Sequence, residues 1–218
     1  GCYASPLAMK MVPGDPPFDV TPLKGKGLKV LHVPDIDFRA SCSLFTTCLK
    51  EVRAWSLAHP DHVPLLLLIN LKEGPGIPGG TVAPDFDAAA FDQVDAEIRS
   101  VFPEDAIITP DRVQGRHPTL KQAVAAGAWP KLKTARGKVM FALDAPEKPV
   151  SLYRGTRKSL EGRVLFINTD PSSPAAGYVT LNEPQTQTAE IAAALAAWRA
   201  DGTLRADHWV GVIEKTVL

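Results

Sequence analysis

The sequence predicts a parallel α/β fold, and three features of its 218 residues indicate this. Short apolar segments of strand character alternate with longer segments whose apolar residues recur at helical spacing. The segment Leu65–Leu71 (LLLLINL) is apolar on both faces, as a strand covered by helices on both sides must be. Polar residues follow the apolar segments, on the edge where parallel α/β proteins build their sites. We therefore expect successive βα units.

The strands are predicted from apolar runs that end at proline, glycine or polar residues. The first is Leu28–Val33 (LKVLHV), which Pro34 stops, and the second is Leu65–Leu71. The further candidates, in chain order, are Ala106–Thr109, Lys138–Leu143, Arg163–Ile167, Tyr178–Leu181 and Trp209–Ile213. These about seven strands are one fewer than a closed eight-stranded barrel contains, and such a barrel typically takes about 250 residues.

Four helices are predicted between the strands, each from an apolar stripe with a start or stop signal. They are Phe45–Trp55 behind a cap at Ser41 or Ser43, Phe91–Phe102 before Pro103, a helix opened by Thr119 and closed at Trp129-Pro130, and one capped by Thr188 and ended by Gly202. Residues 1–26 read as an irregular lead-in, and residues 1–218 as one domain.

Composition narrows the function classes. The 24 Lys and Arg residues balance 24 Asp and Glu residues, so the chain has no basic field for phosphate backbones, and we expect no nucleic-acid partner. The longest nearly apolar run, Val63–Leu71, is too short for a membrane span, which needs about 20 residues. There is also no basic amphipathic helix, so any contact with a membrane surface would be transient and made by rim loops.

The three cysteines leave two interpretations open. Cys42 and Cys48 are six positions apart, and a bridge from a loop to the first helical turn is sterically reasonable. Two reduced, half-buried thiols fit the spacing equally well. The chain opens at Gly1 rather than Met, which fits a processed start. We expect a secreted or extracellular protein whose signal peptide is not in this chain.

The polar residues that follow the strands form the candidate site. In chain order they are His32, Asp35 and Asp37, then Asn70, Lys72 and Glu73, then Thr109 and Asp111, then Asp144, then Asn168 and Asp170, and finally Asn182 and Glu183. One imidazole, one ammonium and many oxygen atoms suit a hard cation such as Ca²⁺ together with a phosphate group. The alternative is that these residues only cap helices and form turns.

A second group of histidines has a simpler interpretation. His59 and His62 have the i, i+3 spacing of a metal pair, but Pro60 lies between them. The segment follows a predicted helix and precedes a predicted strand. We therefore favour a helix-ending turn over a metal site.

Several sequence blocks resemble the Ca²⁺-dependent phosphoinositide-specific phospholipases C of bacteria and fungi. The blocks are KVLHVPDIDFRASC, CLKEVRAWSLAHPDHVPLLLLINLKEG, FDAAAFDQVDAEIRSVFPED, ITPDRVQG, TLKQAVAAGAWPKL and RGKVMFALD, in matching order from about Tyr3 to Asn182. The resemblance implies a (β/α)8 TIM-barrel-like fold, distorted or incomplete, and calcium-assisted cleavage of an inositol phosphodiester. It makes His32 the general acid, Asn70 a calcium ligand and Lys72 a contact to substrate phosphate.

This sequence departs from the family pattern in ways that matter for activity. The family's early His-Asn motif and its Glu-x-Asp calcium pair are not found in it, and Asn70 stands where the family usually has an acidic ligand. We therefore expect a second segment or subunit to complete the barrel and the catalytic set. Two alternatives to a phosphoinositide phospholipase C stay open. One is a catalytically inactive binding or scaffold domain. The other is a glycerophosphodiester-type phosphodiesterase, which would differ from a phosphoinositide phospholipase C in its headgroup selectivity.

Overall fold

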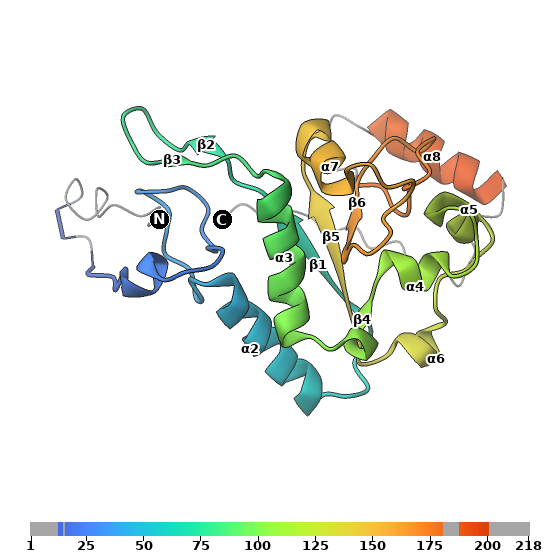
Figure 1. Cartoon of the computed structure of the whole chain (residues 1–218), viewed down its shortest axis with the longest axis horizontal. Coiled ribbons are helices and arrows are strands. Elements are labelled where there is room, and N and C mark those ends of the chain that lie inside the picture. The colour runs from blue at the N-terminus through green and yellow to red at the C-terminus, as the bar shows by residue number, and fades with distance from the viewer. Residues whose placement is uncertain (1–12, 15, 181–187, 201–218) are drawn as a thin grey trace.

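The computed structural model describes residues 13–14, 16–180 and 188–200. Its centre is a four-stranded, fully parallel sheet (Figure 1). The strands are β1 (Leu65–Asn70), β4 (Ile107–Ile108), β5 (Val139–Asp144) and β6 (Leu165–Ile167). β5 pairs with all three others, and its register with β1 runs from Leu65 opposite Val139 to Asn70 opposite Asp144. The α/β class with a parallel sheet is thus confirmed, and within the described residues the sheet stays open rather than closing into a barrel.

The helices of the described residues include the four that the apolar stripes predict and three that they do not. They are α2 (Phe45–Ala58), α3 (Ala88–Val101), α4 (Pro110–Gln114), α5 (Leu120–Ala125), α6 (Leu132–Ala135), α7 (Glu147–Arg154) and α8 (Thr188–Ala200), with 3-10 turns at Thr21–Lys24 and Glu104–Ala106. Thr119 caps α5 as expected, because its side chain accepts a hydrogen bond from the Gln122 amide. The predicted serine cap of α2 is wrong, since Leu44 occupies that position without a side-chain bond. None of the helices in the described part of the chain reaches the length and apolarity of a membrane span.

One apolar core holds the helices against the sheet. Phe141 of β5 is fully buried and meets Phe102 edge to face, with ring centroids 5.6 Å apart. Phe91 and Ile98 on the inner face of α3 belong to the same cluster as the residues of β5 and β6. β5 and β6 are thus buried as strands covered on both faces are, whereas β1, which was predicted to be covered on both sides, is only partly buried and leaves Leu66 exposed.

Two predicted strands are not strands in the described part of the chain. Leu28–Val33 forms only isolated bridges, Lys29 with Leu44 and Val33 with Asp37. Its backbone is instead hydrogen-bonded to the segment before α2, from Val30 N to Ser43 O and from Phe45 N to Leu28 O. Tyr178 makes a single bridge to Asn168. The last candidate, Trp209–Ile213, lies outside the described residues.

The predicted lead-in and the glycine-rich stretch that follows β1 contain some regular structure. A 3-10 turn at Thr21–Lys24 interrupts the lead-in and buries Leu23. The glycine-rich stretch after β1 forms a short antiparallel hairpin of β2 (Gly74–Pro75) and β3 (Val82–Ala83). Figure 1 shows this hairpin and the segment that precedes α2 on the same side of the sheet.

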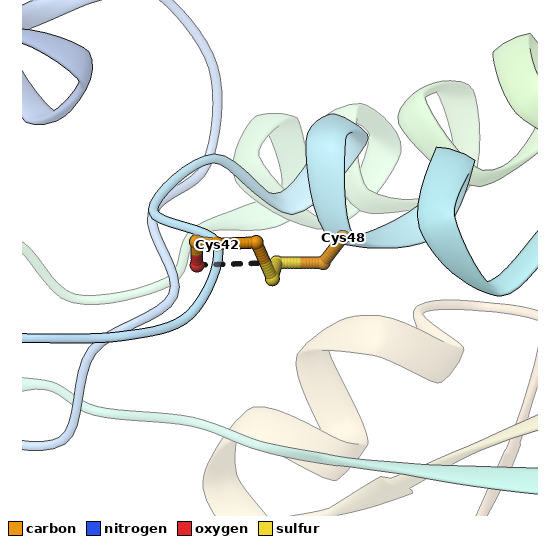
Figure 2. The surroundings of a disulfide bond; sticks show 2 residues. All are labelled: Cys42 and Cys48. Carbon is orange, nitrogen blue, oxygen red and sulfur yellow. Dashed lines mark hydrogen bonds between the residues drawn. A yellow bond between two sulfur atoms is a disulfide. The ribbon is translucent and has the colours of Figure 1, made fainter.

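The structure decides between the two interpretations of the cysteines. Cys42 and Cys48 form a disulfide with a Cα–Cα distance of 5.4 Å (Figure 2). Cys48 lies in the first turn of α2, and its sulfur is 3.2 Å from the Cys42 carbonyl oxygen. The bridge ties the loop that follows Phe38 to the start of α2 and closes a short covalent ring there.

A buried polar cluster joins α3, α7 and the start of β6. The Tyr153 hydroxyl donates to Asp95 Oδ1 over 2.7 Å and accepts the backbone amides of Val164 (3.1 Å) and Leu165 (2.8 Å). Burial raises the pKa of Tyr153 and also that of Asp95. The phenol therefore stays protonated and serves as donor and acceptor at once.

Arg163 completes this cluster. It is only 4% exposed, and its Nη1 lies 3.0 Å from Asp95 Oδ2 and 2.7 Å from Asp92 Oδ1. Its Nε donates to the Tyr153 carbonyl oxygen over 2.7 Å. Since Arg163 lies two positions before the first residue of β6, the cluster is at the end of the sheet opposite to the carboxyl ends of its strands.

Candidate functional site

The carboxyl ends of β1 and β5 bring two oxygen-bearing side chains together. Asn70 and Asp144 are opposite each other in the parallel register. The Asn70 side-chain amide donates to the Asp144 carboxylate and to its backbone carbonyl, both over 3.4 Å. Both side chains thus point to the same side of the sheet edge, as the sequence pattern predicts for successive strand ends.

The end of β6 extends this polar edge. Asn168 directly follows β6, and its side-chain oxygen accepts the Thr180 amide over 3.1 Å. The Tyr178 hydroxyl donates to the Leu143 carbonyl oxygen over 2.9 Å. Burial, with a smaller contribution from the charge of Asp144, raises the pKa of Tyr178 to about 12. Tyr178 is therefore a neutral donor that fixes the end of β5 just before Asp144.

His32 lies in a tight loop and not at the tip of a strand. Its backbone amide donates to the Asp37 carbonyl oxygen over 3.1 Å, and Val33 and Asp37 exchange two further backbone bonds. Its ring Nδ1 lies 2.7 Å from Asp37 Oδ2. Both side chains are exposed. The loop thus presents an imidazole to solvent with one ring nitrogen held by a carboxylate.

The loop that bears His32 is fixed to the hairpin that follows β1. Asp35 is 1% exposed and takes a positive φ of 70°. Its carboxylate accepts the Thr81 amide over 2.5 Å and the Thr81 hydroxyl over 2.9 Å. A Cβ on Gly76 would come within 2.7 Å of Val33 Cγ1, so the close approach of loop and hairpin requires glycine there. The hairpin therefore links the His32 loop to the strand that carries Asn70.

Lys72 lies between Asn70 and the hairpin and is partly buried. The next residue, Glu73, accepts the Phe86 amide over 2.7 Å and so closes the base of the hairpin. No hydrogen bond or ion pair joins His32 to Asn70 or Lys72 in the part of the chain that the structure describes. The structure thus brings Asn70 to Asp144 and His32 to Asp37, and it connects the two pairs through the hairpin.

The donors on this edge match a hard cation in kind. Asn70 offers an amide oxygen and Asp144 a carboxylate, the ligand types that Ca²⁺ prefers. Ca²⁺ takes six to eight oxygen ligands, so these two side chains would be part of a larger set with water and substrate oxygens. Across residues 13–14, 16–180 and 188–200 there is no group of three or more His, Cys, Asp or Glu side chains placed to hold a metal.

The turn at the end of α2 agrees with the preferred interpretation of His59 and His62. His59 caps α2, and its ring Nδ1 bonds to the Trp55 carbonyl oxygen over 2.8 Å. His62 Nδ1 bonds to the Val63 carbonyl oxygen and Nε2 to the hydroxyl of buried Ser56. These rings close the turn and pack on Trp55. The prediction of a helix-ending turn is confirmed.

A comparison with protein families places this geometry in context. Residues 1–201 match the family model described as phosphoinositide phospholipase C, Ca²⁺-dependent. The chain belongs to this family. The match covers most of the 218 residues, and the matched part includes both the His32 loop and the ends of the strands. The family's description also agrees with calcium as the predicted cofactor.

Solved structures similar to this phospholipase C family member include enzymes from two bacterial sources. A Ca²⁺-dependent phosphatidylinositol-specific phospholipase C from Streptomyces antibioticus is 31% identical, with a TM-score of 0.45, over 61% of this chain and 46% of that one. A calcium-dependent enzyme from Pseudomonas sp. is 22% identical, with a TM-score of 0.51, over 69% of this chain and 56% of that one. The latter likeness supports the fold alone. The comparison with curated proteins gave no match.

The family member therefore spans about half the length of these solved structures. Sequence reasoning gave no role to two residues that the structure brings to the site. Asp144, the first polar residue after VMFAL, and Asp37, close to His32, were both among the polar residues of the predicted site, but neither was given a role of its own. The pairing of Asp37 with His32 depends on a tight backbone turn that no periodicity predicts.

Proposed function

We propose that the chain cleaves the phosphodiester bond of phosphatidylinositol or a related inositol phosphodiester, in a calcium-assisted phospholipase C reaction. The observation that carries this proposal is the family match over residues 1–201, which includes the exposed His32 imidazole and the Asn70–Asp144 pair. The similar enzyme from Streptomyces antibioticus is specific for phosphatidylinositol, and the one from Pseudomonas sp. is specific for phosphoinositol.

His32 is the proposed general acid. Its Nε2 makes no hydrogen bond within the described residues, so that nitrogen is open to a leaving-group oxygen. Imidazolium can protonate a departing alkoxide near neutral pH. Lys72, as a flexible point charge, would contact a phosphate oxygen. Calcium, when bound, would lower the pKa of the attacking hydroxyl and neutralise phosphate charge. Asn70 and Asp144 are its proposed ligands on this edge.

Removal of calcium tests the proposed reaction directly. Turnover of a soluble inositol phosphodiester should stop in the presence of a calcium chelator and return when calcium is restored. Asn70→Asp adds a charged ligand, so the calcium concentration for half-maximal rate should fall about 10-fold, and Asn70→Ala should raise it by a similar factor. Gln122→Glu adds the same charge on exposed α5 and should leave the calcium requirement unchanged. Full turnover without calcium would contradict the proposal.

We further propose that the hairpin and the His32 loop touch the membrane surface transiently. Ile36 is 42% exposed and Val82 62% exposed, on two segments that the Asp35–Thr81 bonds hold together. Insertion of such side chains into the headgroup region favours binding.

Ile36→Ser with Val82→Ser should therefore weaken co-sedimentation with phosphatidylinositol-containing vesicles by about 10-fold. The rate on a soluble substrate should not change. Leu57→Ser removes a side chain as exposed as Val82 (62%) near the end of α2, the helix that leads into the start of β1, and it is the matched control. Equal loss of vesicle binding in both variants would count against a docking role for the hairpin.

We also propose that a further segment or a second subunit extends the sheet at β1. Within the described residues β1 has β5 as its one strand neighbour, and Leu66 is 41% exposed. A hollow of about 410 Å³ beside this edge is lined by Glu51, Val52, Trp55 and Leu65. An added strand would pair the open peptide groups. Amide hydrogen exchange at Leu66 and Leu68 that is fast in the complete protein would argue against this.

Finally, we propose that the protein works outside the reducing cytosol. The Cys42–Cys48 disulfide supports this, because such bridges persist in oxidising compartments. Alkylation of the protein taken from its source should find both thiols blocked. Two free thiols would oppose an extracellular location.

A further inference from the structure

A carboxylate holds one nitrogen of the proposed general acid. Asp37 Oδ2 lies 2.7 Å from His32 Nδ1, and an ionised carboxylate can only accept hydrogen bonds. Nδ1 must therefore carry the proton of this bond. In the neutral imidazole, Nε2 is then the nitrogen without a proton, and it is the one open to solvent and substrate.

The backbone builds this pairing before any substrate arrives. His32 N and Val33 N both donate to the Asp37 carbonyl oxygen, over 3.1 and 3.0 Å, and Asp37 N donates to the Val33 carbonyl oxygen over 2.9 Å. Asp35 anchors the turn between them to Thr81. An exposed ion pair normally loses much of its value to the entropy of ordering two side chains. Here the turn has already placed both side chains, so the pairing serves orientation more than stability.

We propose that Asp37 is a positioning residue that fixes the tautomer and the direction of the His32 ring. This inference rests on the proposed phosphodiesterase function. With Nδ1–H held by Asp37, the only proton that the imidazolium can release to a leaving oxygen is the one on Nε2. After that transfer the ring is left neutral with Nδ1–H still bonded to Asp37. One proton moves from Nε2 to the alkoxide, and no other group changes its protonation.

The test uses the tautomer of His32 as a readout that needs no turnover. Two-bond ¹H–¹⁵N correlation spectra distinguish imidazole rings protonated at Nδ1 from those protonated at Nε2. We expect neutral His32 to be in the Nδ1–H form in the wild type and to shift to the Nε2–H form in Asp37→Ala. Asp37→Asn keeps an acceptor oxygen without the charge and should retain part of the Nδ1–H form. His62, held by Ser56 and Val63, is an internal reference in every spectrum.

Kinetics supply the second readout. Asp37→Ala should lower kcat on the soluble phosphodiester about 100-fold, the cost of a misplaced catalytic group, with KM nearly unchanged. Asp61→Ala, which removes an exposed carboxylate beside His62, should change neither kcat nor the His32 tautomer. An unchanged tautomer in Asp37→Ala would overturn the inference, and so would a changed tautomer with full kcat. Wild-type protein without calcium-dependent hydrolysis would refute the proposed function instead, and the spectra would still decide what Asp37 does to the ring.

Discussion

Replacement of His32 by alanine is expected to lower kcat on an inositol phosphodiester by about 100- to 10,000-fold, the usual contribution of a general acid. The exposed ring nitrogen at the end of the His32 loop is the group that would protonate the leaving oxygen. A leaving group that is stable as an anion needs no proton. The loss should therefore shrink strongly with a nitrophenyl leaving group, and steady-state rates for the two substrates measure this difference.

His59→Ala is the matched control for this prediction. His59 is also an exposed histidine, but it is stacked on Trp55 at the end of α2. Its removal should leave both rates unchanged. An equal loss on the alkyl and nitrophenyl substrates in His32→Ala would show that His32 does not act as the acid, whatever else it contributes.

Asp95→Ala is expected to reduce the free energy of unfolding by about 3–5 kcal/mol, the cost of removing one partner from a buried ion pair. Arg163 would keep Asp92 as a partner, but only at the surface, because the Asp92 side chain is 68% exposed. The Tyr153 hydroxyl would also lose its acceptor. Urea unfolding followed by circular dichroism measures the change.

Two further variants divide this loss among the members of the cluster. Asp92→Ala removes the exposed partner of Arg163 and should cost at most about 1 kcal/mol. Tyr153→Phe leaves the Leu165 amide without its acceptor, while the Val164 amide keeps Asp95 Oδ1, and should cost about 1–3 kcal/mol. Similar losses of unfolding free energy in Asp92→Ala and Asp95→Ala would show that burial does not determine how much an ion pair contributes to stability.

The sequence predicts the core of this fold well because the core strands are apolar on both faces. β1 and β6 fall within their predicted segments, β5 extends one residue beyond its own, to Asp144, and Asn70 meets the end of β5 as the ends of neighbouring parallel strands should. Helix α7 (Glu147–Arg154) was not predicted, because its short apolar face is interrupted by Pro149. An apolar pattern must continue over several helical turns before it can be distinguished from the sequence of a loop.

The first predicted strand fails for a different reason. Leu28–Val33 has strand composition, but a strand also needs a neighbour, and its backbone bonds go to Ser43, Phe45 and Asp37 instead. Leu28 and Val30 still pack on the core, so apolar content alone does not distinguish a strand from an irregular segment that packs on the core. The placement of His32 depends on the turn at Asp35 and its bonds to Thr81, a contact between residues 46 positions apart. Local patterns carry no information about such a contact.

The bridge in Figure 2 has a practical consequence for anyone who handles the protein. It joins the segment that follows the His32 turn to the first turn of α2. Dithiothreitol in a purification buffer would therefore release this segment. Activity lost in such a buffer would resemble a damaged catalytic group. Assay samples should therefore be prepared without reductant, and a bacterial host should export the protein to its periplasm.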